Sequence, residues 1–91
     1  MARVYIPALI QDLTQQAVVE VEIPAGQSLT VGQVLDRLDA RFPGLRERMV
    51  YHGDLLPGIA VFVDHEQGFM KLLEKVRPGS EVHFLPPIVG G

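Results

Sequence analysis

The residues with the clearest chemical use lie at the C-terminal end of the chain. An apolar strand there leads into the segment Leu85, Pro86, Pro87, Ile88, Val89, Gly90 and Gly91. Pro86 and Pro87 lack the N–H that a β-ladder needs, so the strand ends near Leu85 and the chain continues in an extended, polyproline-type path. Residues 86–91 span at most about 20 Å. Gly90 and Gly91 carry no side chain, so the final carboxylate fits a passage too narrow for a Cβ atom.

This pattern predicts a carboxylate that is presented on an arm to another protein's active site. The alternative is a chain end without a role, since termini are commonly disordered.

The body of the chain offers no comparable chemistry. There is no cysteine, which removes disulfides, thiolate metal sites and cysteine nucleophiles. The runs Asp64-His65-Glu66 and His52-Gly53-Asp54 contain metal-ligand residue types, but neighbouring side chains on a strand or turn diverge. We therefore interpret both as polar turns and predict no metal site. No nucleophile, base and orienting group occur together, so we do not expect the chain to be an enzyme by itself.

Length and charge restrict the function further. Ninety-one residues form one domain, and a 47% hydrophobic content supplies a core without disulfides or metal. The formal charge of −3 is scattered, with no basic stripe, so a nucleic acid is a poor candidate partner. No apolar run approaches the roughly 20 residues of a membrane span. We expect a cytoplasmic protein that does not bind a membrane.

The periodicity predicts an α+β fold. Alternating apolar residues indicate strands at residues 2–6, 18–23, 59–63 and 81–85. A helix is expected over residues 30–42, with Thr30 as its N-cap and an apolar stripe formed by Val31, Val34, Leu35, Leu38 and Phe42. Residues 45–50 suggest a further helical turn, residues 51–58 a loop, and residues 69–75 a short segment that packs Leu72 and Leu73. The prediction is a mixed sheet of four to five strands with one main helix across it, in a domain of residues 1–85 followed by a tail of residues 86–91.

Alternation also predicts a partner-binding patch at the base of the tail. His83 and Leu85 should point away from the core. Tyr5 and Pro7 should lie on the outer face of the first strand, close to Leu85 if the first and last strands pair. Exposed apolar residues beside a functional arm favour a partner surface, although isolated surface apolar residues are also common.

The run VRPGSEVHFLPPIVGG at residues 76–91 resembles the end of the ubiquitin-like sulfur carriers. It is most similar to the small subunit of molybdopterin synthase, which has a Pro-Pro step before its Gly-Gly end. The sulfur carriers of the thiamin pathway and of a cysteine-synthesis route share the Gly-Gly end but usually lack that step. The element order is also similar, and the resemblance implies a β-grasp fold.

The resemblance further implies a reaction sequence. A ubiquitin-activating-like enzyme would adenylate the Gly91 carboxylate with ATP, and a sulfur donor would convert the acyl-adenylate into a thiocarboxylate. The carrier would then deliver sulfur inside the large subunit of molybdopterin synthase or another sulfur-accepting enzyme. Gly90 would keep the passage clear. The carrier would bind no cofactor, since ATP is used by the activating partner.

Two positions depart from the carrier pattern. Ser80 replaces the usual acidic residue before Glu81, and Val63-Asp64-His65-Glu66 stands where a Val-Asn-Gly turn is common. These differences leave the sulfur acceptor open, with the cysteine and thiamin routes as alternatives. A ubiquitin-like modifier joined to proteins through Gly91 is another alternative, because its first activation step is the same. A third is an interaction domain of this fold whose Gly-Gly end has no role.

Overall fold

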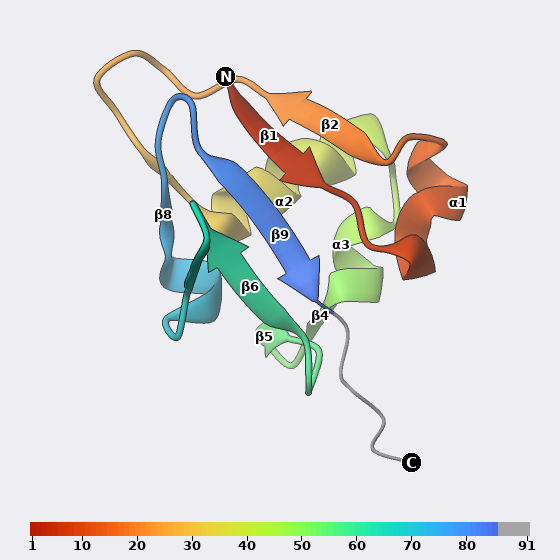
Figure 1. Ribbon diagram of the computed structural model, residues 1–91. Coiled ribbons are helices and arrows are strands. Elements are labelled where there is room, and N and C mark those ends of the chain that lie inside the picture. The colour runs from red at the N-terminus through yellow and green to blue at the C-terminus, as the bar shows by residue number, and fades with distance from the viewer. Residues whose placement is uncertain (86–91) are drawn as a thin grey trace.

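A computed structural model describes residues 1–85 of the chain and shows a sheet with one long helix across one face (Figure 1). The sheet has five strands, in the order β2 (Val18–Val21), β1 (Ala2–Tyr5), β9 (Glu81–Leu85), β6 (Ala60–Val63) and β7 (Glu66–Gln67). β1 pairs with β9 in parallel, and the other neighbours are antiparallel. The predicted α+β fold, with a mixed sheet and one main helix, is confirmed.

The main helix α2 (Val31–Arg41) begins where its N-cap was predicted. The Thr30 hydroxyl accepts a hydrogen bond from the Gln33 N–H at 3.1 Å, and the Gln33 side chain accepts one from the Thr30 N–H at 2.9 Å. This reciprocal capping box satisfies two N–H groups that would otherwise lack partners. The predicted stripe is buried from Val31 to Leu38, whereas Phe42 follows the last helical residue and is only partly buried.

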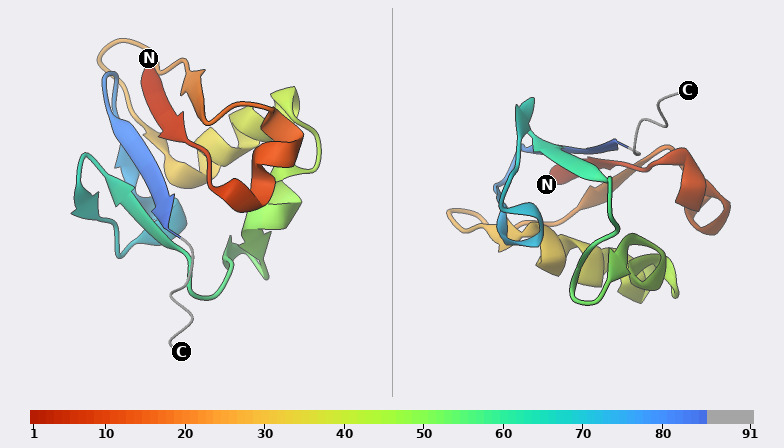
Figure 2. Two further views of the ribbon diagram at one scale, coloured as in Figure 1. Left: turned by 45° about the vertical axis from the view of Figure 1, so that its right-hand side comes forward. Right: turned by 90° about the horizontal axis from the view of Figure 1, so that it is seen from below.

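The helix covers one face of the sheet and leaves the other face open, as the view from below shows (Figure 2). Within β1 and β9, alternate residues point into this helix-covered core: Ala2 and Val4 from β1, and Val82 and Phe84 from β9. Arg3, Tyr5, His83 and Leu85 therefore lie on the open face.

Short elements complete the described chain. They are η1 (Ala8–Ile10), α1 (Gln11–Thr14), β3 (Leu29–Thr30), α3 (Leu45–Met49), β4 (Val50–Tyr51), β5 (Asp54–Leu55), η2 (Lys71–Leu73) and β8 (Lys75–Val76). The further helical turn expected at residues 45–50 is confirmed as α3. Part of the loop expected at residues 51–58 instead belongs to a small hairpin of β4 and β5, closed by His52 and Gly53, whose φ angles of 52° and 79° make a tight reversal. Within residues 1–85, no helix is both long and apolar enough to cross a membrane.

The segment around η2 differs from the prediction. Leu72 packs against the core, but the side chain of Leu73 is 63% exposed. A 3-10 turn of three residues cannot direct two adjacent side chains to the same side, because successive residues are about 120° apart around its axis.

Candidate docking face and C-terminal arm

The open face of the sheet carries a row of aromatic rings across three neighbouring strands. In the strand register, Tyr5 of β1 lies opposite His83 of β9, and His83 lies opposite Phe62 of β6. The rings of Tyr5 and His83 are stacked, with centroids 4.0 Å apart and planes inclined by 10°. Parallel pairing of the first and last strands places Tyr5 beside the last strand, as the sequence suggested.

A charged group borders this row on the side away from Leu85. Glu81 is its centre: one carboxylate oxygen accepts a hydrogen bond from the Tyr5 hydroxyl at 3.2 Å and lies 3.7 Å from the Arg3 guanidinium. The other oxygen lies 3.5 Å from Nε2 of His65. Because Tyr5 belongs to both groups, Glu81 fixes one end of the aromatic row.

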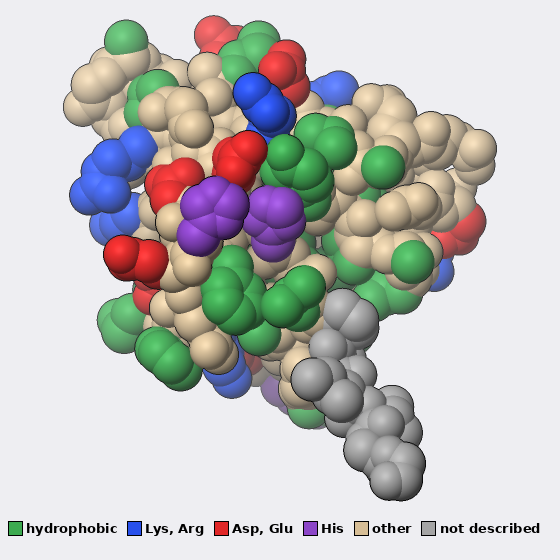
Figure 3. Space-filling view, viewed as in Figure 1, with side chains coloured by type: hydrophobic (Ala, Val, Ile, Leu, Met, Phe, Trp, Pro, Cys, Tyr) green, Lys and Arg blue, Asp and Glu red, His purple; other side chains and the backbone are tan. Residues whose placement is uncertain are grey.

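An apolar hollow lies beside Phe62 and His83 of this row. Its volume is about 260 Å³, and it is lined by Phe62, His65, His83 and Leu85. Figure 3 shows this face, with histidine side chains at its centre and hydrophobic side chains beside them. Leu85 is 49% exposed, which confirms its predicted outward position, and it is the last described residue. The described part of the chain therefore ends at the rim of an exposed apolar hollow. We refer to the surface of Tyr5, Phe62, His83 and Leu85 as the docking face.

Pro7 does not extend this face, which corrects the expected outward position. It is buried, because β1 ends at Tyr5 and strand alternation no longer applies two residues later. Pro7 instead precedes η1, where its carbonyl accepts a hydrogen bond from the Ile10 N–H at 3.0 Å.

The two departures from the carrier pattern contact each other. Asp64 accepts a hydrogen bond from the Ser80 hydroxyl at 3.0 Å and another from the Glu81 N–H at 2.9 Å. The Ser80 oxygen also accepts one from the Arg77 N–H at 3.0 Å. Asp64 and His65 form the turn between β6 and β7, with φ angles of 51° and 71°. Asp64 therefore serves this turn as a hydrogen-bond acceptor, while Glu66 already belongs to β7. Among residues 1–85, no group of three metal-ligand side chains suited to an ion is found.

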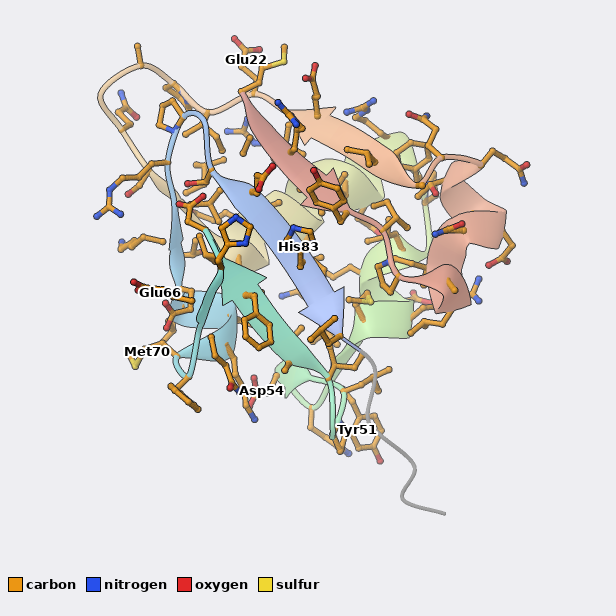
Figure 4. All side chains as sticks on the ribbon, viewed as in Figure 1. Glu22, Tyr51, Asp54, Glu66, Met70 and His83 are labelled. Carbon is orange, nitrogen blue, oxygen red and sulfur yellow. The ribbon has the colours of Figure 1, made fainter. Side chains whose placement is uncertain are left out.

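The sequence interpretation missed a second exposed apolar surface. Phe69, Met70 and Leu73 have side chains that are 79%, 62% and 63% exposed, and they line a groove of about 560 Å³ together with Asp54 and Lys71. Figure 4 places Met70 beyond β6, at the opposite end of the sheet from β1 and β2. The available signal was a pair of large apolar residues directly after a glycine, in a segment that follows no strand alternation.

Six of the predicted site residues lie outside the described part of the chain: Pro86, Pro87, Ile88, Val89, Gly90 and Gly91. Their roles, and the division of the chain into a domain of residues 1–85 and a tail, remain predictions.

Comparison with known families tests the resemblance at the C-terminal end. A model of the ThiS family matches residues 4–91. The chain belongs to the ThiS family. Its members share the β-grasp fold and are ubiquitin-like carriers of sulfur or protein modifiers, small carrier proteins rather than catalysts. No curated protein matches the chain in a sequence search.

Solved structures agree with this assignment. The ThiS-family chain is similar to a chain of the Amycolatopsis orientalis BexX/CysO complex, with a TM-score of 0.85 and 26% identity over 100% of both chains. It is also similar to SAMP1 from Haloferax volcanii, with a TM-score of 0.76 and 27% identity over 99% of this chain and 98% of that one. Subunit 1 of a molybdopterin converting factor from Pyrococcus furiosus is similar with a TM-score of 0.69 and 19% identity, over 96% of this chain and 97% of that one. At this identity the likeness shows the fold alone.

Proposed function

We propose that this ThiS-family protein is a sulfur carrier whose Gly91 carboxylate is adenylated and then converted into a thiocarboxylate, with molybdopterin synthesis as the destination of the sulfur. One observation carries the proposal: the arm that ends in Gly90 and Gly91 starts at Leu85, on the rim of an exposed apolar and aromatic face. A partner that covers this face would receive the arm in a fixed direction. The Pro86-Pro87 step favours molybdopterin synthesis over the other routes.

The chemistry needs no catalytic side chain on the carrier. A carboxylate is a poor electrophile, and its attack on the α-phosphorus of ATP releases pyrophosphate and forms an acyl-adenylate. A sulfide donor attacks the carbonyl carbon, AMP leaves with the bonding electron pair, and a thiocarboxylate remains. Where the donor is a persulfide, the same attack gives an acyl disulfide, and a thiol of the donor protein then attacks the donor-side sulfur, forms a disulfide with it and releases the thiocarboxylate. The carrier contributes position, since holding the reacting carboxylate near its target lowers the entropic part of the barrier.

Two relatives favour a second candidate. The chain is nearer in identity to the BexX/CysO complex and to SAMP1, a small archaeal modifier protein, than to the molybdopterin converting factor. The sulfur acceptor could therefore be an enzyme other than molybdopterin synthase, or Gly91 could be joined to protein lysines. The chain's own lysines are Lys71 and Lys75, which leaves little scope for self-linked chains.

Alkylation and mass spectrometry test the carrier role. The protein is purified from its own cells, treated with a thiol-alkylating reagent and cut by a lysine-specific protease after Lys75. The resulting fragment of residues 76–91 contains neither cysteine nor methionine, so neither thiol alkylation of a side chain nor methionine oxidation can imitate a labelled thiocarboxylate. We expect the label on this fragment, and its transfer to product by the large subunit of molybdopterin synthase.

The matched control is a chain with one residue added after Gly91. It should fold normally and carry no label, because the carboxylate is displaced from the end of the Gly-Gly pair. Absence of label in the wild-type chain, when an adenylating enzyme, ATP and a sulfur source are supplied, would reject the carrier role. Isopeptide-linked conjugates in the lysate would favour the modifier.

A further inference from the structure

His83 occupies the centre of the docking face. It is stacked on Tyr5 with ring centroids 4.0 Å apart, lies opposite Phe62 in the sheet register, and lines the hollow next to Leu85. Imidazole is the one side chain whose ordinary pKa places its change of charge between pH 5 and pH 8. A titratable ring therefore lies in the middle of a surface whose neighbouring side chains are mostly apolar or aromatic.

The ionisable groups around His83 already interact with one another. They come from β1 (Arg3 and Tyr5), β9 (Glu81) and the turn after β6 (Asp64 and His65), while β6 itself presents Phe62. Arg3, Tyr5 and His65 surround the Glu81 carboxylate at 3.7, 3.2 and 3.5 Å. Asp64 accepts hydrogen bonds from the Ser80 hydroxyl and the Glu81 N–H. Among the described residues, neither carboxylate has a hydrogen bond or ion pair with His83.

We propose that the adenylating partner binds this carrier with His83 neutral, so that docking is weakened by protonation of this one ring. The inference rests on the proposed function, which supplies the partner and the face. A partner that covers Phe62 and Leu85 removes water from the ring between them. Removing water from an imidazolium costs much more than removing it from a neutral ring, and the nearby carboxylates are engaged elsewhere.

His65 differs from His83 in this respect. Its side chain is 81% exposed at the rim of the hollow, with Glu81 as its neighbour. It can stay hydrated and paired in either charge state when the centre of the face is covered. The pH dependence of docking is therefore assigned to His83 alone, and one proton is excluded when the partner binds.

The test measures the dissociation constant for the adenylating enzyme of the same organism between pH 5.5 and pH 7.5, with circular dichroism to confirm folding. Exclusion of one proton from the docked complex predicts weaker affinity at pH 5.5 than at pH 7.5, by at most tenfold per pH unit. His83→Phe retains an aromatic ring beside Tyr5 and should lose this pH dependence, whatever its affinity at pH 7.5. Protonation of the enzyme itself affects its binding to wild type and variant equally. It therefore cancels in the ratio of their dissociation constants at each pH.

His52→Phe is the matched control, because His52 lies in the β4–β5 hairpin beside Tyr51 rather than on the docking face. It should retain the pH dependence of the wild type, as should His65→Gln. If His83→Phe fails to fold or bind, calorimetry on the wild type tests the inference instead. Docking is measured at pH 6.0 in two buffers of different ionisation enthalpy, and we expect protons to be released on binding.

Several results would overturn the inference: the same dependence in wild type and His83→Phe, loss of the dependence in His65→Gln, tighter binding at low pH, or no proton release. Adenylation at pH 7.5 combined with any of these would leave the proposed function intact. Failure of the enzyme to bind or adenylate the wild-type chain at every pH would reject the function and the inference together.

Discussion

Ser80→Asp should destabilise the protein, although an acidic residue is usual at this position in the carriers that the sequence resembles. Ser80 is 5% exposed, and its hydroxyl donates to Asp64 while accepting from the Arg77 N–H. An aspartate at this position would retain an acceptor for Arg77 but would place a second carboxylate beside Asp64. The structure therefore predicts that this substitution is unfavourable because of Asp64.

The expected cost is the smaller of two alternatives. If both carboxylates stay in place, two charges 4 Å apart repel by about 4 kcal/mol at an effective dielectric constant of 20. If the exposed Asp64 rotates away, its carboxylate loses its hydrogen bonds to residue 80 and to the Glu81 N–H, each worth about 1.5 kcal/mol. Rotation is the cheaper alternative, so we expect a loss of about 3 kcal/mol in the free energy of unfolding.

Urea unfolding of the four proteins of a double-mutant cycle measures this loss in the free energy of unfolding. For a small domain, about 3 kcal/mol corresponds to a decrease of roughly 1–3 M in the urea midpoint. Asp64→Asn alone should cost less than 1 kcal/mol, because an amide can accept from Glu81 N–H and donate to Ser80. The double substitution should recover most of the loss, since the amide can donate to the introduced carboxylate. Wild-type stability in Ser80→Asp, or a purely additive double substitution, would refute the coupling between these positions.

Three further predictions concern the scaffold of the docking face. Leu38→Ala should lower the free energy of unfolding by about 2–5 kcal/mol in urea titrations, because Leu38 is 1% exposed in the core. Thr30→Ala should cost about 1 kcal/mol in the same assay, because the capping box with Gln33 is lost; equal stability would show that the cap contributes nothing. The Arg48 side chain, which donates to Asp12 at 2.8 Å, lowers the pKa of that carboxyl below its ordinary value of 3.8, so the pair stabilises the fold above that pH and the contribution is lost as the pH falls through the lowered value. Arg48→Met should therefore reduce the fall in stability between pH 5 and pH 2, as thermal unfolding at each pH would show.

The amino-acid sequence determined those features that depend on neighbouring residues. Alternation in residues 2–6 and 81–85 assigned Tyr5, His83 and Leu85 to the outer face, because successive side chains of a strand point to opposite sides. The Thr30 cap and the apolar stripe located α2, since capping and helical spacing are local. The presentation of a carboxylate by residues 86–91 was predicted from their prolines and glycines, and its adenylation from the resemblance to sulfur carriers. Both stay predictions, because these residues lie outside the described part of the chain.

Only the tertiary structure decided which side chains meet across the sheet. Parallel pairing of β1 with β9 places Tyr5 against His83 and brings its hydroxyl to Glu81, 76 positions along the chain. The contact of Asp64 with Ser80 depends in the same way on the register of β6 and β9. Alternation fixes the face of a residue within its own strand, but it contains no information on register between strands. That register follows from how the whole core packs, which is why the residues of the docking face could be named in part from the sequence while their stacking and charge network could not.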